Sequence, residues 1–161
     1  MDFEFAVLEF PETKIAGITV ETDLKHAQQN CQALWEKFGK RVTGELAGHK
    51  AIPEDAAKYG VYQMLTKDKF SYCAGVEINS DTSLPSDLKI ITIPLGMYVT
   101  CQVSDMSKLE DAYKALYEKW PSTQIDYVID NKGLCFERYD YEWKKGDPFE
   151  IYVAVSIKEP N

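Results

Sequence analysis

An acidic residue stands in the middle of an aromatic segment near the C-terminal end of the sequence. In GLCFERYDYEW (residues 133–143), strand alternation places Glu137 on the same face as Cys135 and Tyr139. A carboxylate is disfavoured within a strand, and burying one without a partner is costly. Facing a cleft, Glu137 would attract a cationic aromatic ligand or activate a water molecule; facing solvent, it would be a polar edge residue.

Aromatic side chains with polar atoms are frequent in this chain, which has ten tyrosines and three tryptophans. A tyrosine offers a flat apolar ring and a hydroxyl, which suits the recognition of planar organic molecules. Many of them fall in predicted strands: Tyr59, Tyr62, Tyr72, Tyr98, Tyr139, Tyr141 and Tyr152. Because aromatic residues favour strands in general, core packing stays open as an alternative for each one. We expect part of the set to line a pocket.

An internal repeat provides the elements that must position these side chains. Residues 24–38 and 106–120 both carry apolar residues at helical spacing, and each position in the first segment corresponds to one in the second. The pairs are Leu24 and Met106, Ala27 and Leu109, Cys31 and Tyr113, Leu34 and Leu116, Trp35 and Tyr117, and Phe38 and Trp120. Thr22-Asp23 and Ser104-Asp105 offer side chains that cap helix N-termini. The sequence therefore predicts two related helices.

Strand-like runs surround each predicted helix in the same order. Residues 14–20 and 97–103 precede the helices; residues 59–65 and 71–78 follow the first helix, and residues 134–139 and 151–157 follow the second. The polar stretch 79–87 is predicted to link the two halves. The fold class is thus α+β: two pseudo-symmetric strand-helix-strand-strand modules with antiparallel sheets and a ligand cleft between them. We expect a single domain over residues 1–161, with module one at about 1–80 and module two at about 88–161.

The composition excludes several classes of partner. A formal net charge of −8 argues against direct nucleic-acid binding. The chain has neither a basic leader nor a long apolar run, so we expect a cytoplasmic protein that does not enter membranes. Its four cysteines lack the close spacing of metal ligands, and phosphate-binding glycine motifs are missing, so no metal or other cofactor is expected. The oligomeric state stays open.

Several short motifs, taken in order, resemble those of one known family, the GyrI-like small-molecule-binding domain. They are YGV (59–61), FSYCAGVE (70–77), IPLGMY (93–98), Trp120 and FERY (136–139). This domain also serves as the effector domain of AraC-type and MerR-type regulators. The resemblance implies that Glu137 projects into the cleft between the modules and that Tyr152 lines it. No helix-turn-helix segment is expected beside the two modules.

Three functions follow from these features. The first is the binding of aromatic or cationic small molecules, xenobiotics among them, in an aromatic cleft centred on Glu137. We name as ligand-binding candidates Glu137, Tyr152, Tyr139, Tyr59, Tyr72 and Trp35. The second is an enzyme: some relatives of the family are hydrolases of cyclopropane-bearing DNA-alkylating compounds, for which Glu137 would be the catalytic residue and tyrosine hydroxyls would stabilise developing negative charge. The third is a protein-interaction module like the gyrase-inhibitor branch of the family.

Overall fold

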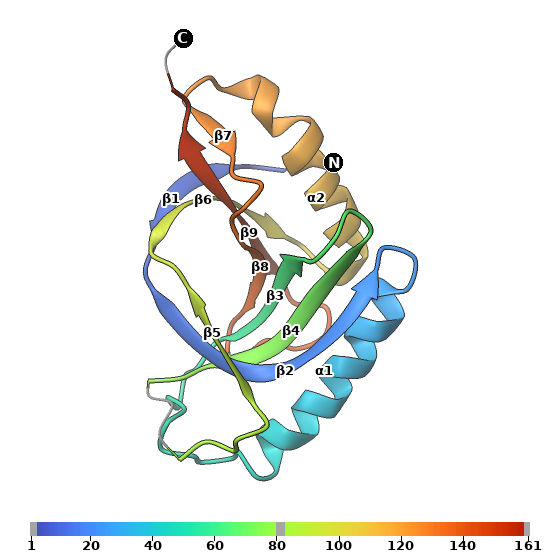
Figure 1. The fold of residues 1–161 in the computed structure, drawn as a ribbon, viewed down its shortest axis with the longest axis vertical. Coiled ribbons are helices and arrows are strands. Elements are labelled where there is room, and N and C mark those ends of the chain that lie inside the picture. The colour runs from blue at the N-terminus through green and yellow to red at the C-terminus, as the bar shows by residue number, and fades with distance from the viewer. Residues whose placement is uncertain (1–2, 80–82, 160–161) are drawn as a thin grey trace.

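The protein is described by a computed structural model over residues 3–79 and 83–159, and Figure 1 shows how its elements are arranged. The strands are β1 (Ala6–Phe10), β2 (Thr13–Asp23), β3 (Lys58–Met64), β4 (Lys69–Glu77), β5 (Lys89–Ile93), β6 (Gly96–Val103), β7 (Tyr127–Ile129), β8 (Cys135–Tyr139) and β9 (Phe149–Ile157). The helices are α1 (Ala27–Thr43) and α2 (Leu109–Glu118), with short 3-10 turns at Met106–Lys108 and Trp120–Thr123. Within these ranges, no helix has the length and apolar character needed to cross a bilayer.

All of these strands belong to one curled antiparallel sheet. The strand order is β1-β6-β9-β8-β3-β4-β2-β5, and β7 adds to the free end of β9. The first half of the chain supplies β2, which precedes α1, and β3 and β4, which follow it. The second half supplies β6, which precedes α2, and β8 and β9, which follow it. The two sets of strands lie in mirrored order on either side of the β8–β3 pairing. This arrangement confirms the predicted α+β class with two pseudo-symmetric strand-helix-strand-strand modules. The domain and module boundaries themselves stay a prediction.

The first strand of each half lies on the sheet of the other half. β1 pairs with β6, and β5 pairs with β2. These edge strands were not predicted, because each has only five residues and lies outside the helices and flanking runs that identified the repeat. The exchange joins the two halves at both edges of the sheet, in addition to the β3–β8 pairing in the middle.

An approximate twofold axis passes through the centre of the sheet. β3 and β8 share a four-residue pattern that begins with an aromatic residue and ends with a tyrosine: YGVY at 59–62 and FERY at 136–139. In this alignment Gly60 corresponds to Glu137, and Tyr62 corresponds to Tyr139. In the antiparallel ladder, Gly60 and Glu137 are also direct cross-strand partners. Two residues that correspond to each other and also face each other must lie at the symmetry axis. The chain therefore places one carboxylate at the axis and a glycine opposite it.

The two faces of the curled sheet carry different cores. The inner face buries a cluster that draws on strands from both halves and includes Phe10, Ile15, Tyr59, Tyr98, Phe136 and Tyr152. The outer face is covered by the helices: α1 packs over one cluster, which includes Phe38 and Tyr72, and α2 over another, which includes Leu116 and Ile151. In Figure 1 both helices lie outside the curl of the sheet, on the same side of the molecule. Their shared environment agrees with the predicted repeat.

The predicted apolar stripes are wrong at their first positions. Leu24 is 89% exposed and Met106 is 47% exposed, because both residues precede the α-helices that were predicted to include them. The capping residues act on these preceding turns: Asp23 accepts a hydrogen bond from the backbone N–H of His26, and Asp105 accepts one from that of Ser107. The helical periodicity is borne out further along, where Leu34 and Phe38 are buried in α1 and Leu116 in α2.

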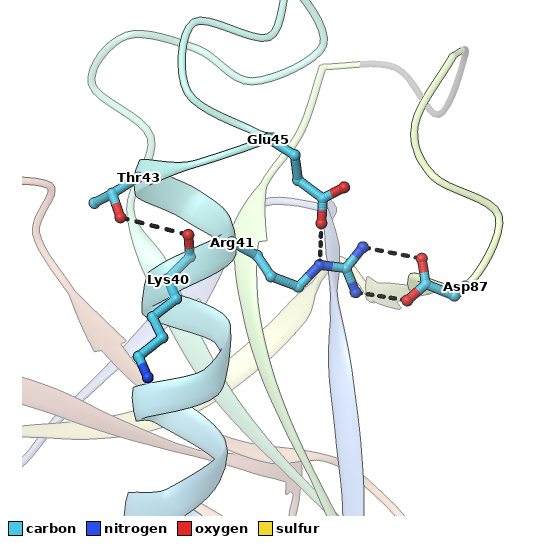
Figure 2. A network of polar contacts seen from close by, with 5 residues as sticks. All are labelled: Lys40, Arg41, Thr43, Glu45 and Asp87. Atoms are coloured by element: carbon cyan, nitrogen blue, oxygen red, sulfur yellow. Dashed lines mark hydrogen bonds and ion pairs between the residues drawn. The ribbon is translucent and has the colours of Figure 1, made fainter.

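An ion-pair cluster ties the C-terminal end of α1 to the segment before β5 (Figure 2). Arg41 contacts Glu45 through Nε and both carboxylate oxygens of Asp87 through its Nη atoms, at 2.6 and 2.9 Å. The hydrogen bonds raise the pKa of Arg41 and lower the pKa of Asp87. Both acids are more than half exposed, so the cluster contributes little to stability. It anchors one end of the predicted linker 79–87, of which residues 80–82 lie outside the described part of the chain.

Candidate functional site

Glu137 lies on the outer face of the sheet, which the two helices cover, in β8, one of the two middle strands. Its exposure is 2%, which is unusual for a carboxylate. Strand alternation directs Cys135, Glu137 and Tyr139 to this face and Phe136 to the inner face, as the sequence predicts. No Lys, Arg or His side chain of the described residues forms an ion pair with it. The site is therefore a buried acid without a basic partner in the part of the chain that the structure describes.

Tyrosine hydroxyls donate to this carboxylate the hydrogen bonds that water would donate to an exposed one. Tyr72 and Tyr139 donate to Oε1 at 3.0 and 2.8 Å. Tyr62 donates to Oε2 over a short contact, and Tyr113 lies 3.5 Å from the same oxygen. Two carboxylate oxygens accept about four hydrogen bonds, so these four donors from β3, β4, β8 and α2 fill the available positions.

The electrostatics of the site are set by burial. Desolvation raises the pKa of Glu137, and the tyrosine hydrogen bonds oppose this by favouring the charged form. Burial and the nearby carboxylate raise the pKa of Tyr62, Tyr72, Tyr113 and Tyr139 well above the usual value. The hydroxyls thus stay protonated at neutral pH, and all of them remain donors.

Gly60 makes room for this arrangement. A Cβ atom at this position would lie 1.9 Å from the Tyr72 hydroxyl and 2.9 Å from Glu137 Oε1. Such contacts are impossible, so a side chain here would displace the tyrosine or the carboxylate. The glycine opposite the acid is therefore a geometric requirement of the site.

Aromatic rings enclose the carboxylate from several sides. Trp35 of α1 donates from its indole N–H to the Tyr72 hydroxyl at 2.7 Å, and its ring meets the ring of Tyr139 edge-on, with centroids 5.7 Å apart. The ring of Tyr62 contacts those of Tyr72 and Tyr113, at centroid distances of 4.8 and 5.9 Å. These edge-on contacts are a favoured geometry for aromatic pairs. They bridge α1, α2 and the sheet around Glu137.

Two thiols lie near the carboxylate as well. Cys31 is on α1, and Cys135 is two residues before Glu137 on β8. Burial, together with the charge of Glu137, raises the pKa of each thiol to about 12. Both are therefore neutral, weakly nucleophilic groups in this conformation.

The structure brings four of the six candidate residues together: Glu137, Tyr139, Tyr72 and Trp35. It places the other two on the inner face, where Tyr152 stacks on Phe136 with centroids 4.8 Å apart and Tyr59 packs beside the same ring. Neither Tyr59 nor Tyr152 contacts the carboxylate.

Two residues of the site were missed as ligands of Glu137. The sequence analysis predicts Tyr62 only as a strand tyrosine, although it lies two residues beyond Gly60 and therefore on the same face as the acid. Alternation along β3 would have identified it. Tyr113 was assigned to the helix stripe, and its approach to Glu137 depends on how α2 docks on the sheet, which periodicity does not determine.

Comparison with known proteins identifies one family over most of the chain. The Cass2 family model, described as integron-associated effector binding protein, matches residues 7–155. No protein of curated function matches the chain. Among solved structures, an integron cassette protein from the mobile metagenome of Vibrio cholerae is similar at 20% identity, with a TM-score of 0.68, over 96% of this chain and 97% of that chain.

Two further structures share the fold. SAV2435, solved bound to tetraphenylphosphonium, has 16% identity and a TM-score of 0.72 over 95% of this chain and 94% of its own. The C-terminal domain of EcmrR has 21% identity and a TM-score of 0.63 over 97% of this chain and 99% of its own. These likenesses extend over nearly the full length of each chain.

Proposed function

The chain belongs to the family of integron-associated effector-binding proteins, and from this premise we propose that its effector is a cationic aromatic molecule bound at Glu137. Membership also confirms the resemblance to GyrI-like effector-binding domains. One observation carries the proposal: Glu137 is buried and has no basic partner among the described residues. A carboxylate in this state gains much more from a cation than an exposed one does.

The neighbours of Glu137 suit an aromatic cation. Tyr62, Tyr72, Tyr139 and Trp35 present rings around the carboxylate, and ring faces attract cations when water is excluded. Charge recognition would thus come from Glu137, and shape recognition from the rings.

Binding requires the enclosed site to open. The contact of Tyr113 with Glu137, at 3.5 Å, is the longest of the four and the only one of them made by a helix residue. Displacing Tyr113 would therefore break the weakest of these hydrogen bonds and uncover Oε2 from the side of α2. We expect the ligand to replace Tyr113 at the carboxylate while the three strand tyrosines remain in place.

A solved relative of the fold supports the choice of ligand class. SAV2435 was solved with tetraphenylphosphonium, a cation that carries four aryl rings. The same molecule is a suitable first probe for this chain, because its single charge is surrounded by aromatic surface. Multidrug or xenobiotic binding would follow if several unrelated aromatic cations compete for the site.

An enzymatic role is the second candidate, and the arrangement of donors favours it in one respect. Glu137 could activate a water molecule while tyrosine hydroxyls stabilise the negative charge that develops as a cyclopropane-bearing substrate opens. In the present conformation the tyrosines occupy the acceptor positions that a water molecule would need. Hydrolysis therefore requires a larger rearrangement than simple binding does.

Two measurements on the wild type and Glu137→Gln test the function. In the first, each protein is titrated with aromatic cations and the heat of binding is measured by calorimetry. In the second, each protein is incubated with cyclopropane-bearing aromatic compounds and the products are analysed by chromatography. Binding that depends on Glu137, without product, supports an effector-binding role. Product that disappears in the variant would assign the hydrolase role. Absence of binding and of product for the wild type would contradict both and leave the protein-interaction alternative.

A further inference from the structure

The hydrogen bond from Trp35 to Tyr72 has a fixed direction. An indole N–H can only donate, so the Tyr72 oxygen is the acceptor of the 2.7 Å contact. The hydroxyl has a single proton, and Glu137 Oε1 lies 3.0 Å from its oxygen. Trp35, Tyr72 and Glu137 therefore form a chain of donors that ends on the carboxylate.

Such a chain strengthens its last hydrogen bond. A hydroxyl that accepts a hydrogen bond becomes a better donor, and the effect is larger where water is excluded. Tyr72 is 1% exposed, and a donor directed at a carboxylate stabilises its charged form. Burial works in the opposite direction and favours the neutral acid. The indole N–H is thus placed to offset part of the cost of keeping this buried group charged.

We propose that Trp35 is a positioning residue of the Glu137 site: acting through Tyr72, its indole N–H keeps the carboxylate charged and ready for a cation. This inference rests on the proposed function for its binding arm alone. The state of the carboxylate in the free protein can be measured without any ligand. Trp35 is then more than part of the aromatic lining, because its nitrogen has a separate role.

The asymmetry of the repeat supports a dedicated role for this pair. In the helices, the counterpart of Trp35 is Tyr117, and in the sheet the counterpart of Tyr72 is Phe149. Phenylalanine cannot relay a hydrogen bond. The donor chain therefore exists in one half of the molecule, although the single carboxylate lies at the axis between the halves.

The titratable groups that face Glu137 are tyrosine hydroxyls and thiols. They are Tyr62 from β3, Tyr72 from β4, Tyr139 and Cys135 from β8, Tyr113 from α2 and Cys31 from α1. Each of these has a pKa raised above its usual value, so none of these six gains charge between pH 5 and 8. A pH dependence of cation binding in this range would report the proton on Glu137.

The test compares Trp35→Phe, Tyr72→Phe and the double variant, with Trp120→Phe as a matched control. Trp35→Phe keeps a ring and removes the donor. Trp120 occupies the position that corresponds to Phe38 in the repeat, so the control introduces a ring that the other half already has there. Trp120 is buried in the core cluster below α2 and is not among the four described side chains that donate hydrogen bonds to Glu137. The pKa of Glu137 is measured by carbon-13 NMR of the carboxyl group, without ligand. Tetraphenylphosphonium affinity is measured from pH 5 to 8.

We expect Trp35→Phe to raise the pKa of Glu137 and to weaken tetraphenylphosphonium binding about fivefold at the acid end of the range. The loss should shrink as pH rises, because Glu137 then ionises without help. In the Tyr72→Phe background, Trp35→Phe should have little further effect on the pKa, since the relay is already broken. Trp120→Phe should leave the pKa of Glu137 unchanged.

An unchanged pKa in a folded Trp35→Phe protein would overturn the inference, as would an affinity loss that is equal at every pH. If Trp35→Phe does not fold, Tyr72→Phe carries the test, and an unchanged pKa there would also overturn it. Failure of the proposed function looks different: the wild type would not bind tetraphenylphosphonium, while the NMR comparison would still show whether Trp35 acts on Glu137.

Discussion

Gly60 and Glu137 face each other across the β3–β8 ladder and are also each other's counterparts in the internal repeat. A repeated carboxylate at this place would put two negative charges side by side in a buried position, which is strongly unfavourable. The glycine removes the second charge and also leaves the space that the Tyr72 hydroxyl occupies. A duplicated fold thereby obtains a site with a single acid and donors from both halves.

The first prediction concerns the space at Gly60. Gly60→Ala should lower the free energy of unfolding by about 1–3 kcal/mol, because the added methyl group collides with the Tyr72 hydroxyl and approaches Glu137. Gly39→Ala is the matched control: nothing lies within 4 Å of a Cβ at this position in α1, so it should stabilise the protein by about 0.5–1 kcal/mol. Urea unfolding measures both, and equal effects of the two substitutions would contradict the account.

The second prediction concerns the cost of the buried acid. Burial raises the pKa of Glu137 above its ordinary value of 4.5, so the folded protein holds this proton more tightly than the unfolded chain. The stability contributed by the neutral acid is fully present below the unfolded pKa and is lost as pH rises through the folded pKa.

Glu137→Gln replaces the acid by a neutral side chain, so the loss of stability with rising pH disappears. The variant should be more stable than the wild type by about 1 kcal/mol at pH 8, with a smaller difference at pH 4. Urea unfolding of both proteins over this range supplies the comparison, in which groups common to both cancel. A wild type that is more stable than the variant at pH 8 would show that the carboxylate is a stabilising element rather than a group retained for binding.

The third prediction ranks the hydroxyl donors. Tyr139 donates to Glu137 at 2.8 Å from a buried position, so Tyr139→Phe should cost about 1.5–3 kcal/mol in the free energy of unfolding and raise the pKa of Glu137. Tyr113→Phe removes the longer contact, at 3.5 Å, and should lower the free energy of unfolding by less than about 1 kcal/mol, on the scale of an ordinary hydrogen bond. Thermal or urea unfolding together with carboxyl NMR checks the order. The reverse order would mean that α2, and not the sheet, holds the carboxylate.

The fourth prediction uses Cys135 as a reporter of opening. Burial raises the pKa of this thiol to about 12, and Tyr113 and Tyr117 of α2 lie next to it. A thiol reagent at pH 8 should therefore modify Cys135 at least about tenfold more slowly than it does the unfolded chain.

Tetraphenylphosphonium should change the rate at which the thiol reagent modifies Cys135. The reason is that the proposed ligand replaces Tyr113, which lies next to this thiol. A variant that keeps Cys135 and replaces the other three cysteines by serine or alanine isolates the signal. A rate equal to that of the unfolded chain would show that the site is already open in the free protein.

Much of this arrangement could be predicted from the sequence, and the reasons are physical. The repeat and the 3.6-residue and two-residue periods identified both helices and six of the strands, because burial on one face controls these patterns. Alternation along residues 133–139 also placed Glu137 on the face of Tyr139. The exchange of β1 and β5 between the halves could not be predicted, since two short edge strands carry no signal of their partner.

The membership of the site was predicted less completely. The structure places Tyr72 and Trp35 beside Glu137, and Tyr59 and Tyr152 on the inner face. Counting tyrosines does not separate the two faces of a sheet; the parity of each residue along its strand does. Tyr113 depends on helix docking, which is a tertiary property. Gly60 belongs to the YGV motif, and its role follows from the cross-strand pairing with Glu137, which the motif does not specify.

The most direct test of the central claim compares two ions of almost the same shape and opposite charge, tetraphenylphosphonium and tetraphenylborate, by calorimetric titration of the wild type and Glu137→Gln. If the buried carboxylate selects a cation, the wild type will bind the phosphonium and not the borate. The substitution should then weaken phosphonium binding at least about tenfold, as expected for loss of a buried charge pair. Equal affinity of the wild type for both ions, or unchanged phosphonium binding by the variant, would contradict a binding site built on Glu137.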